Sequence, residues 1–121
     1  MTTYHAIVWL DHQEAHVIHF DREHIEAQKI KSRSVHKAGN TNSTDEQFFH
    51  SVACAVSNAQ EILVTGPAHA KDEFRAHCER HDKDVAQRIV AVLPSDHPSD
   101  GQLVAWARQY FHKYDAMQGQ A

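Results

Sequence analysis

The chain of 121 residues has few of the residue types that mark disulfide-rich, fibrous or membrane-spanning proteins. Two cysteines, four glycines and three prolines exclude a disulfide framework and a low-complexity composition. No apolar run approaches the roughly 20 residues that cross a bilayer, and the N-terminus has no basic and apolar signal region. We therefore expect a cytoplasmic protein with reduced thiols and no membrane partner.

Basic residues are also in the minority, with 12 lysines and arginines against 16 aspartates and glutamates. The net charge of −4 disfavours general binding to polyanions, so no DNA partner is expected. Residues 27–44, however, contain no acidic side chain and carry a charge of +4, which leaves −8 on the rest of the chain. The sequence is also rich in histidine, with 12 residues, so its charge changes near pH 6.5.

The order of apolar segments predicts a single α/β domain over residues 1–121, with a core at about 4–114. Three short segments joined by turns, at 4–10, 14–20 and 24–33, predict an antiparallel three-stranded meander. Two buried parallel strands are expected at Ile62–Thr65 and Ile89–Leu93. With three main helices among them, the result is a mixed five-stranded sheet of ribonuclease H-like topology.

Capping signals predict where the helices begin. Thr44 with Gln47, and Ser99 with Gln102, have the spacing of a capping box. Pro67 suits the first position of a helix that runs from about residue 68 to 81. The side chains expected to face the core are Phe48, Phe49, Val52, Ala53 and Val56, then Ala70, Phe74 and Cys78, then Leu103, Trp106, Ala107, Tyr110, Phe111 and Tyr114.

Residues that could support catalysis are sparse. The predicted strands lack the converging carboxylates that a two-metal nuclease requires. The run Ser95–His97 has the residue types of a triad, but consecutive residues cannot line up as nucleophile, base and orienting group. His77 and His81 are one helical turn apart and could share a metal, although Cys78 between them aligns with the buried stripe. We expect no catalytic residues, no metal and no cofactor.

The strongest local signal is a basic strand end followed by a loop, over residues 29–40. Three cations alternate on one strand face after the apolar Ile25 and Ala27, so this strand is expected to leave the core there. Cations with this spacing suit the phosphates of RNA, and the alternative is an ordinary solvated face. The candidate RNA-binding residues are Lys29, Lys31, Arg33, His36, Lys37, Gly39 and Asn40.

The run EILVTGPAHAKDEFRAH at residues 61–77 resembles the central domain of Pelota-type ribosome-rescue factors, with its strand, Gly-Pro turn and Lys-x-x-Phe helix. The Phe48-Phe49 helix and the three-strand opening also resemble the middle domain of archaeal and eukaryotic class-one peptide release factors. The resemblance covers about residues 4–114 and implies the release-factor middle-domain fold. Because the flanking domains of those families are not seen, it also implies a freestanding bacterial relative, of the kind labelled a translational machinery protein.

In release factors, the loop after the third strand carries a Gly-Gly-Gln tripeptide that positions water for ester hydrolysis. The matching residues here are Ala38, Gly39 and Asn40, so one glycine is missing and the amide side chain is one methylene shorter. Catalysis is sensitive to displacements of about 1 Å, and Pelota-type domains rescue ribosomes without the tripeptide. The resemblance therefore favours a non-catalytic, translation-associated protein that binds the ribosome or RNA. The alternatives are a peptidyl-tRNA ester hydrolase and a protein-interaction module, and no pattern indicates the oligomeric state.

Overall fold

The computed structural model describes residues 5–21, 23–32 and 41–117, and at 41–45 and 114–117 it describes the backbone alone. The strands are β1 (His5–Leu10), β2 (Glu14–Phe20), β3 (Ile25–Lys31), β4 (Glu61–Gly66) and β5 (Ile89–Pro94). The helices are α1 (Thr41–Ala55), α2 (Ala70–His81), α3 (Lys83–Arg88) and α4 (Asp100–Met117). None of the helices within these ranges is long and apolar enough to cross a bilayer.

The five strands form one mixed sheet in the order β3-β2-β1-β4-β5. β1, β2 and β3 pair as an antiparallel meander, whereas β4 is parallel to β1 and β5 is parallel to β4. The predicted α/β fold, meander and parallel crossover are therefore confirmed. Both meander turns are built on an aspartate: Asp11 Oδ1 accepts the N–H groups of Gln13 and Glu14, and Asp21 Oδ1 accepts those of Glu23 and His24.

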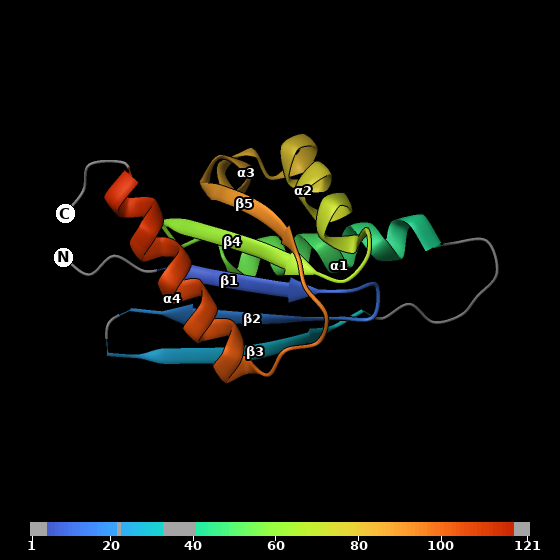
Figure 1. The fold of residues 1–121 in the computed structure, drawn as a ribbon. Coiled ribbons are helices and arrows are strands. Elements are labelled where there is room, and N and C mark those ends of the chain that lie inside the picture. Colours follow the sequence, from blue (N-terminus) through green and yellow to red (C-terminus); the bar gives the residue numbers. More distant parts are fainter. Residues whose placement is uncertain (1–4, 22, 33–40, 118–121) are drawn as a thin grey trace.

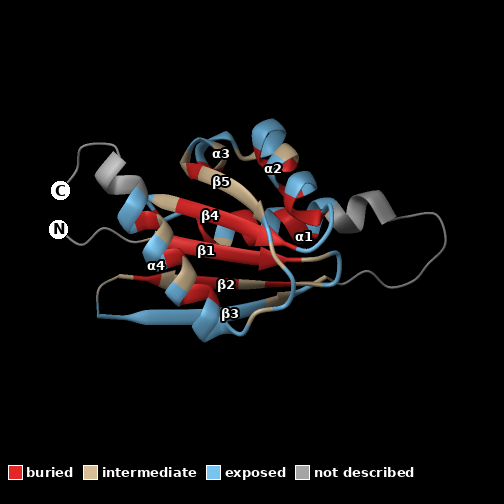
Figure 2. Cartoon of the chain, viewed as in Figure 1, coloured by how far each residue is buried: buried red, intermediate tan, exposed pale blue. Residues whose placement is uncertain are grey.

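Two hydrophobic cores lie on opposite faces of the sheet. In Figure 1, α4 crosses one face, and α1 and α2 cover the other. Alternate residues of β1 explain this division, because Val8 packs toward α1 and α2 whereas Ile7 packs toward α4. Figure 2 shows that β1 and β4, the central strands, are the most continuously buried. In α4, Leu103, Ala107 and Phe111 are buried as predicted, but Trp106 and Tyr110 are half-buried and the side chain of Tyr114 lies outside the description.

Only one of the three predicted helix starts is correct. Ser99 caps α4 as expected, because its Oγ accepts the Gln102 N–H at 3.2 Å while the Gln102 amide oxygen accepts the Ser99 N–H at 2.9 Å. The capping box at Thr44 is wrong: α1 begins at Thr41, and no glycine or proline between Thr41 and Gln47 stops the helix from extending back.

The start of α2 differs from the prediction because of the turn before it. Helix α2 begins at Ala70, with His69 as its N-cap, so Pro67 does not occupy the first helical position. Gly66 lies so close to Leu10 that a Cβ built on the glycine would be 2.2 Å from the Leu10 carbonyl oxygen. The chain first leaves this contact through residues 67–69 and only then begins the helix. The predicted inward residues Ala70, Phe74 and Cys78 are nevertheless buried.

Two further elements differ from expectation. The short helix α3 was not predicted, since its six residues are too few to show a helical period. Strand β5 was expected to be buried on both faces, but it lies at the edge of the sheet and residues 90–93 are half-buried. A continuous apolar run indicates a strand, whereas its position within the sheet depends on contacts that are distant in sequence.

Candidate nucleic-acid interface

The predicted basic segment begins on the other edge strand, β3. Lys29 and Lys31 are exposed there, at the end of the strand, and they share one face of it. Of the seven candidate RNA-binding residues these two are described by the structure, whereas Arg33, His36, Lys37, Gly39 and Asn40 lie outside the described residues. The loop alternatives that depend on Ala38, Gly39 and Asn40 therefore have no structural description.

The face of β3 that carries the lysines is exposed along its whole length. Ile25 and Ala27, which were expected to be in the core, are exposed, and Ile25 retains 53% of its accessible surface. The residue that packs inward is Ile30, on the opposite face, where it meets the core beneath α1. The expectation that β3 leaves the core at Lys29 is therefore wrong. As an edge strand, β3 shows its lysine face to solvent from Ile25 onward.

Two carboxylates beside the lysine face, Glu14 of β2 and Asp100 of α4, contact a histidine. In the strand register Lys29 lies opposite His16, and Lys31 lies opposite Glu14. His16 Nε2 is 3.1 Å from Glu14 Oε2, and its Nδ1 is 3.0 Å from Asp100 Oδ1 at the start of α4. Among the residues that the structure describes, neither lysine forms an ion pair.

Histidine 16 titrates differently from a free histidine because of these two contacts. Its partial burial acts to lower the pKa, but the hydrogen bonds and charges of Asp100 and Glu14 outweigh burial, so the pKa of His16 is raised above 6.5. Protonated His16 offsets one of the two negative charges beside the lysine face.

A cleft of about 720 Å³ lies between the end of β3 and helix α1. Residues 29–31 form one wall, and Gln47, Phe48, His50 and Ser51 form the other. Gln47, His50 and Ser51 are exposed polar residues that recur at helical spacing on α1, opposite its buried face. These residues were not among the predicted site residues, although their polar stripe could have indicated a second wall beside the basic strand.

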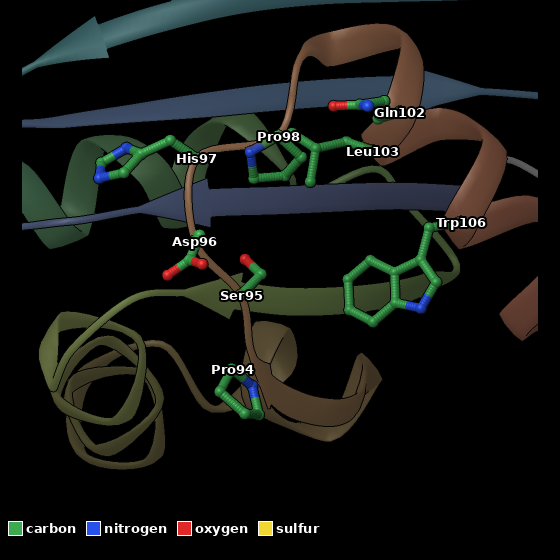
Figure 3. Close-up of a pocket in the computed structure, with 8 residues that line it drawn as sticks. All are labelled: Pro94, Ser95, Asp96, His97, Pro98, Gln102, Leu103 and Trp106. Atoms are coloured by element: carbon green, nitrogen blue, oxygen red, sulfur yellow. The ribbon is translucent and has the colours of Figure 1, made fainter.

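A second cleft, of about 610 Å³, opens beside the carboxyl ends of β4 and β5 (Figure 3). Thr65 Oγ1 donates to the Leu93 carbonyl oxygen at 2.6 Å and lies 2.8 Å from Ser95 Oγ, and the Trp9 indole N–H donates to the Asp96 carbonyl at 2.6 Å. These bonds hold the linker between β5 and α4. In Figure 3 the His97 side chain points away from the Ser95 hydroxyl. The His97 ring lies instead beside Trp9, with the ring centroids 4.9 Å apart, so this run forms no triad. The cleft is lined by Pro94, Ser95, Asp96, His97, Pro98, Gln102, Leu103 and Trp106.

Among the described residues, the two histidines and the cysteine of α2 do not form a group of metal ligands. His77 and Cys78 are buried, whereas His81 is exposed, and the two histidine rings lie with their centroids 5.0 Å apart. Burial, helped by Asp82 and Glu79, raises the pKa of the Cys78 thiol to about 12, so Cys78 stays protonated in the core. Cys78 is thus a packing residue.

No family model matches the sequence, and neither does any curated protein. Solved structures do match. The Pelota protein of Thermoplasma acidophilum has a TM-score of 0.63 and 22% sequence identity, and the match covers 83% of this chain and 30% of that protein. Archaeoglobus fulgidus Pelota has a TM-score of 0.65 and 13% identity, and the match covers 88% of this chain and 31% of that protein. The archaeal translation termination factor aRF1 has a TM-score of 0.62 and 10% identity, and the match covers 98% of this chain and 42% of that protein. The chain therefore has the release-factor and Pelota middle-domain fold, as predicted, and it spans less than half the length of these proteins.

Proposed function

We propose that the chain is a cytoplasmic, non-catalytic and translation-associated protein that binds ribosomal RNA through residues 29–40. Two observations support the proposal. The fold is shared with Pelota and with a translation termination factor. The described part of the basic segment presents Lys29 and Lys31, exposed and without carboxylate partners among the described residues.

The exposed lysine pair is the observation that carries the proposal. Lys29 and Lys31 alternate on β3, so their Cα atoms are about 7 Å apart, close to the spacing of successive phosphates along an extended strand of nucleic acid. The acidic groups beside them, Glu14 and Asp100, are held by His16. A phosphate backbone can therefore approach β3 without meeting an unpaired carboxylate of the adjacent strand.

The cleft lies on the α1 side of β3, opposite the face on which Lys29 and Lys31 alternate, so it offers a second set of hydrogen-bonding groups at the same strand end. Gln47 and Ser51 stand on the α1 wall, and amide and hydroxyl groups can bond to phosphate and ribose oxygens. Contacts of this kind position a backbone without reading its sequence. The proposed interface is therefore expected to tolerate different RNA sequences.

The test is binding to ribosomal RNA over a series of salt concentrations. The variant carrying Lys29→Glu and Lys31→Glu should bind more weakly, and the slope of log affinity against log salt should fall by roughly one to two. The matched control carries Lys83→Glu and Lys113→Glu, two exposed lysines on α3 and α4, and changes the net charge equally. Equal losses in both variants would attribute the effect to net charge, and no loss in the first would remove the proposed interface.

A further inference from the structure

Two histidines and an aspartate from different elements meet where α1 packs against the junction of α2 and α3. His50 Nδ1 lies 3.3 Å from Asp82 Oδ2, and His77 Nε2 lies 3.0 Å from the same oxygen. The three atoms are all within 4.8 Å of one another. In the part of the chain that the structure describes, no other three histidine, cysteine or acidic side chains gather this closely.

The orientation of Asp82 is not explained by helix capping. Asp82 is the N-cap residue of α3, a position where an aspartate carboxylate commonly accepts a backbone N–H of the first turn. Its side chain makes no such bond. The carboxylate turns instead toward the two imidazoles and holds both of them on one oxygen atom. The Asp82 carboxylate is thus placed to contact His50 and His77 and not to cap α3.

The ring nitrogens of His50 are arranged as in a metal-bound histidine. While Nδ1 points at Asp82, Nε2 lies 3.5 Å from the Cys54 sulfur, one helical turn along α1. A histidine that binds a metal through one nitrogen usually donates the N–H of the other to a fixed acceptor, and that acceptor sets the tautomer. Cys54 Sγ can accept this N–H, which leaves the Nδ1 lone pair directed at the cluster.

His77 adds a buried donor atom to the site. Its side chain is 5% exposed, and its Nε2 faces Asp82 while its Nδ1 has no hydrogen-bond partner within the described residues. A metal at Nε2 would move the ring proton to Nδ1, where no acceptor of the described chain receives it. Outer partners of this kind change metal affinity by roughly 10- to 100-fold, so we expect micromolar rather than nanomolar binding.

We propose that His50, His77 and Asp82 form a binding site for a divalent transition-metal ion, with Zn²⁺ as the preferred ion and water in the fourth position. Two imidazoles and a carboxylate are ligands that Zn²⁺ commonly takes. Ligand atoms about 2.0–2.1 Å from a tetrahedral ion lie roughly 3.3 Å apart, close to the two observed separations. The exposed ring of His50 can close the third distance. This inference does not depend on the proposed RNA binding.

A comparison with His16 shows why an imidazole with two neighbouring carboxylates does not by itself form a metal site. His16 also contacts two acidic groups, Glu14 and Asp100, but through opposite nitrogens of its ring. One ion cannot bind both carboxylates across the ring. At the proposed site the two histidines instead address the same carboxylate oxygen, so a single ion can replace the protons between them.

The test uses Co²⁺, whose visible absorption reports tetrahedral coordination, and Zn²⁺, which should displace it. The full chain should bind one equivalent of Co²⁺ with this absorption and release it to Zn²⁺. His50→Ala and Asp82→Asn should each weaken Zn²⁺ binding by at least tenfold. The matched control is His24→Ala, because His24 Nδ1 lies 3.4 Å from Asp21 Oδ1 but has no second histidine.

The measured affinities distinguish metal binding at this site from binding by other surface histidines. Unchanged affinity in His24→Ala together with losses in the two cluster variants would support the proposal. Equal affinity of the unaltered chain and His50→Ala, or absence of tetrahedral Co²⁺ absorption, would overturn it. His50 is exposed, so its replacement should leave the fold intact, and the far-ultraviolet circular dichroism of each variant checks this.

Discussion

Gly66, at the end of β4, lies against the backbone of Leu10 in β1. Its φ is +157°, and an added Cβ would lie 2.2 Å from the Leu10 carbonyl oxygen. Because this contact is with backbone, a side chain at residue 66 could be accommodated only by moving one of two central strands. The Gly66 carbonyl also accepts the Ser95 N–H at 3.0 Å, so such a movement would reach the end of β5.

Gly66→Ala should therefore lower the free energy of unfolding by about 2–4 kcal/mol, as measured by urea denaturation. Gly101→Ala provides the control, since Gly101 lies in α4 and the nearest atom to an added Cβ is Ser99 Oγ at 4.0 Å. Alanine is preferred over glycine in a helix, so the control should gain up to about 1 kcal/mol. If Gly66→Ala left the unfolding free energy unchanged or raised it, as Gly101→Ala should, the close approach of Gly66 to Leu10 would be contradicted.

His16 should make the stability of the protein depend on pH. A histidine whose pKa is raised on folding stabilises the protonated protein, and this contribution is complete below pH 6.5 and is lost as pH rises through the folded pKa. The difference in unfolding free energy between the chain and His16→Gln should thus be largest below pH 6.5 and shrink above it. Urea denaturation over pH 5–9 measures it. A difference that grows with pH would contradict the raised pKa.

Helix starts illustrate what a local pattern can and cannot predict. The Ser99–Gln102 box was predicted and forms, because its two partners need only each other. The Thr44–Gln47 box has the same spacing but lies inside α1, where the preceding residues continue the helix. A capping signal thus fails where no helix-breaking residue stands before it.

Substitution of the two capping candidates should give opposite results. Ser99→Ala removes the hydroxyl that accepts the Gln102 N–H, and should lower the unfolding free energy by about 1 kcal/mol. Thr44→Ala should cause no loss, because Thr44 lies within α1 and alanine has the higher helix propensity. Thermal unfolding of both variants measures the difference. If Thr44→Ala lowered the stability as much as Ser99→Ala, the result would contradict our conclusion that Thr44 is not a helix cap.

The strands show the same division between local and long-range information. The apolar runs of β1 and β4 and the aspartate turns of the meander were sufficient to predict the central sheet. Edge positions were not predictable, since Ile25 and the half-buried β5 resemble core residues in sequence. Short helix α3 gave no periodic signal. The neighbours of a strand depend on its pairing with strands that are distant in sequence, and a short stretch of residues does not reveal that pairing.

The sequence prediction found only the β3 side of the candidate interface. The alternation of Lys29 and Lys31 could be seen in the sequence, and both are exposed. The α1 wall of the cleft could have been suggested by its polar stripe. By contrast, the meeting of His50 with Asp82 joins residues 32 positions apart, and it depends on how α1 packs against α2.

Taken as a whole, the molecule is an acidic α/β domain with a basic segment that begins on an edge strand. The central strands bury residues on both faces, so edge strands and helix surfaces are the parts of the fold free to meet a partner. The three solved structures compared above share this fold, and the chain spans 30–42% of their length. The proposed binding to RNA rests on the charge pattern, which begins on an edge strand of this fold.

Co-sedimentation with ribosomal particles tests this account most directly. At low salt the unaltered chain should travel with the particles and leave them as salt increases, because its attachment depends on phosphate contacts. The Lys29→Glu and Lys31→Glu variant should stay in the free fraction, while the Lys83→Glu and Lys113→Glu control should still sediment. A free unaltered chain at low salt, or a bound β3 variant, would contradict the proposed attachment through β3.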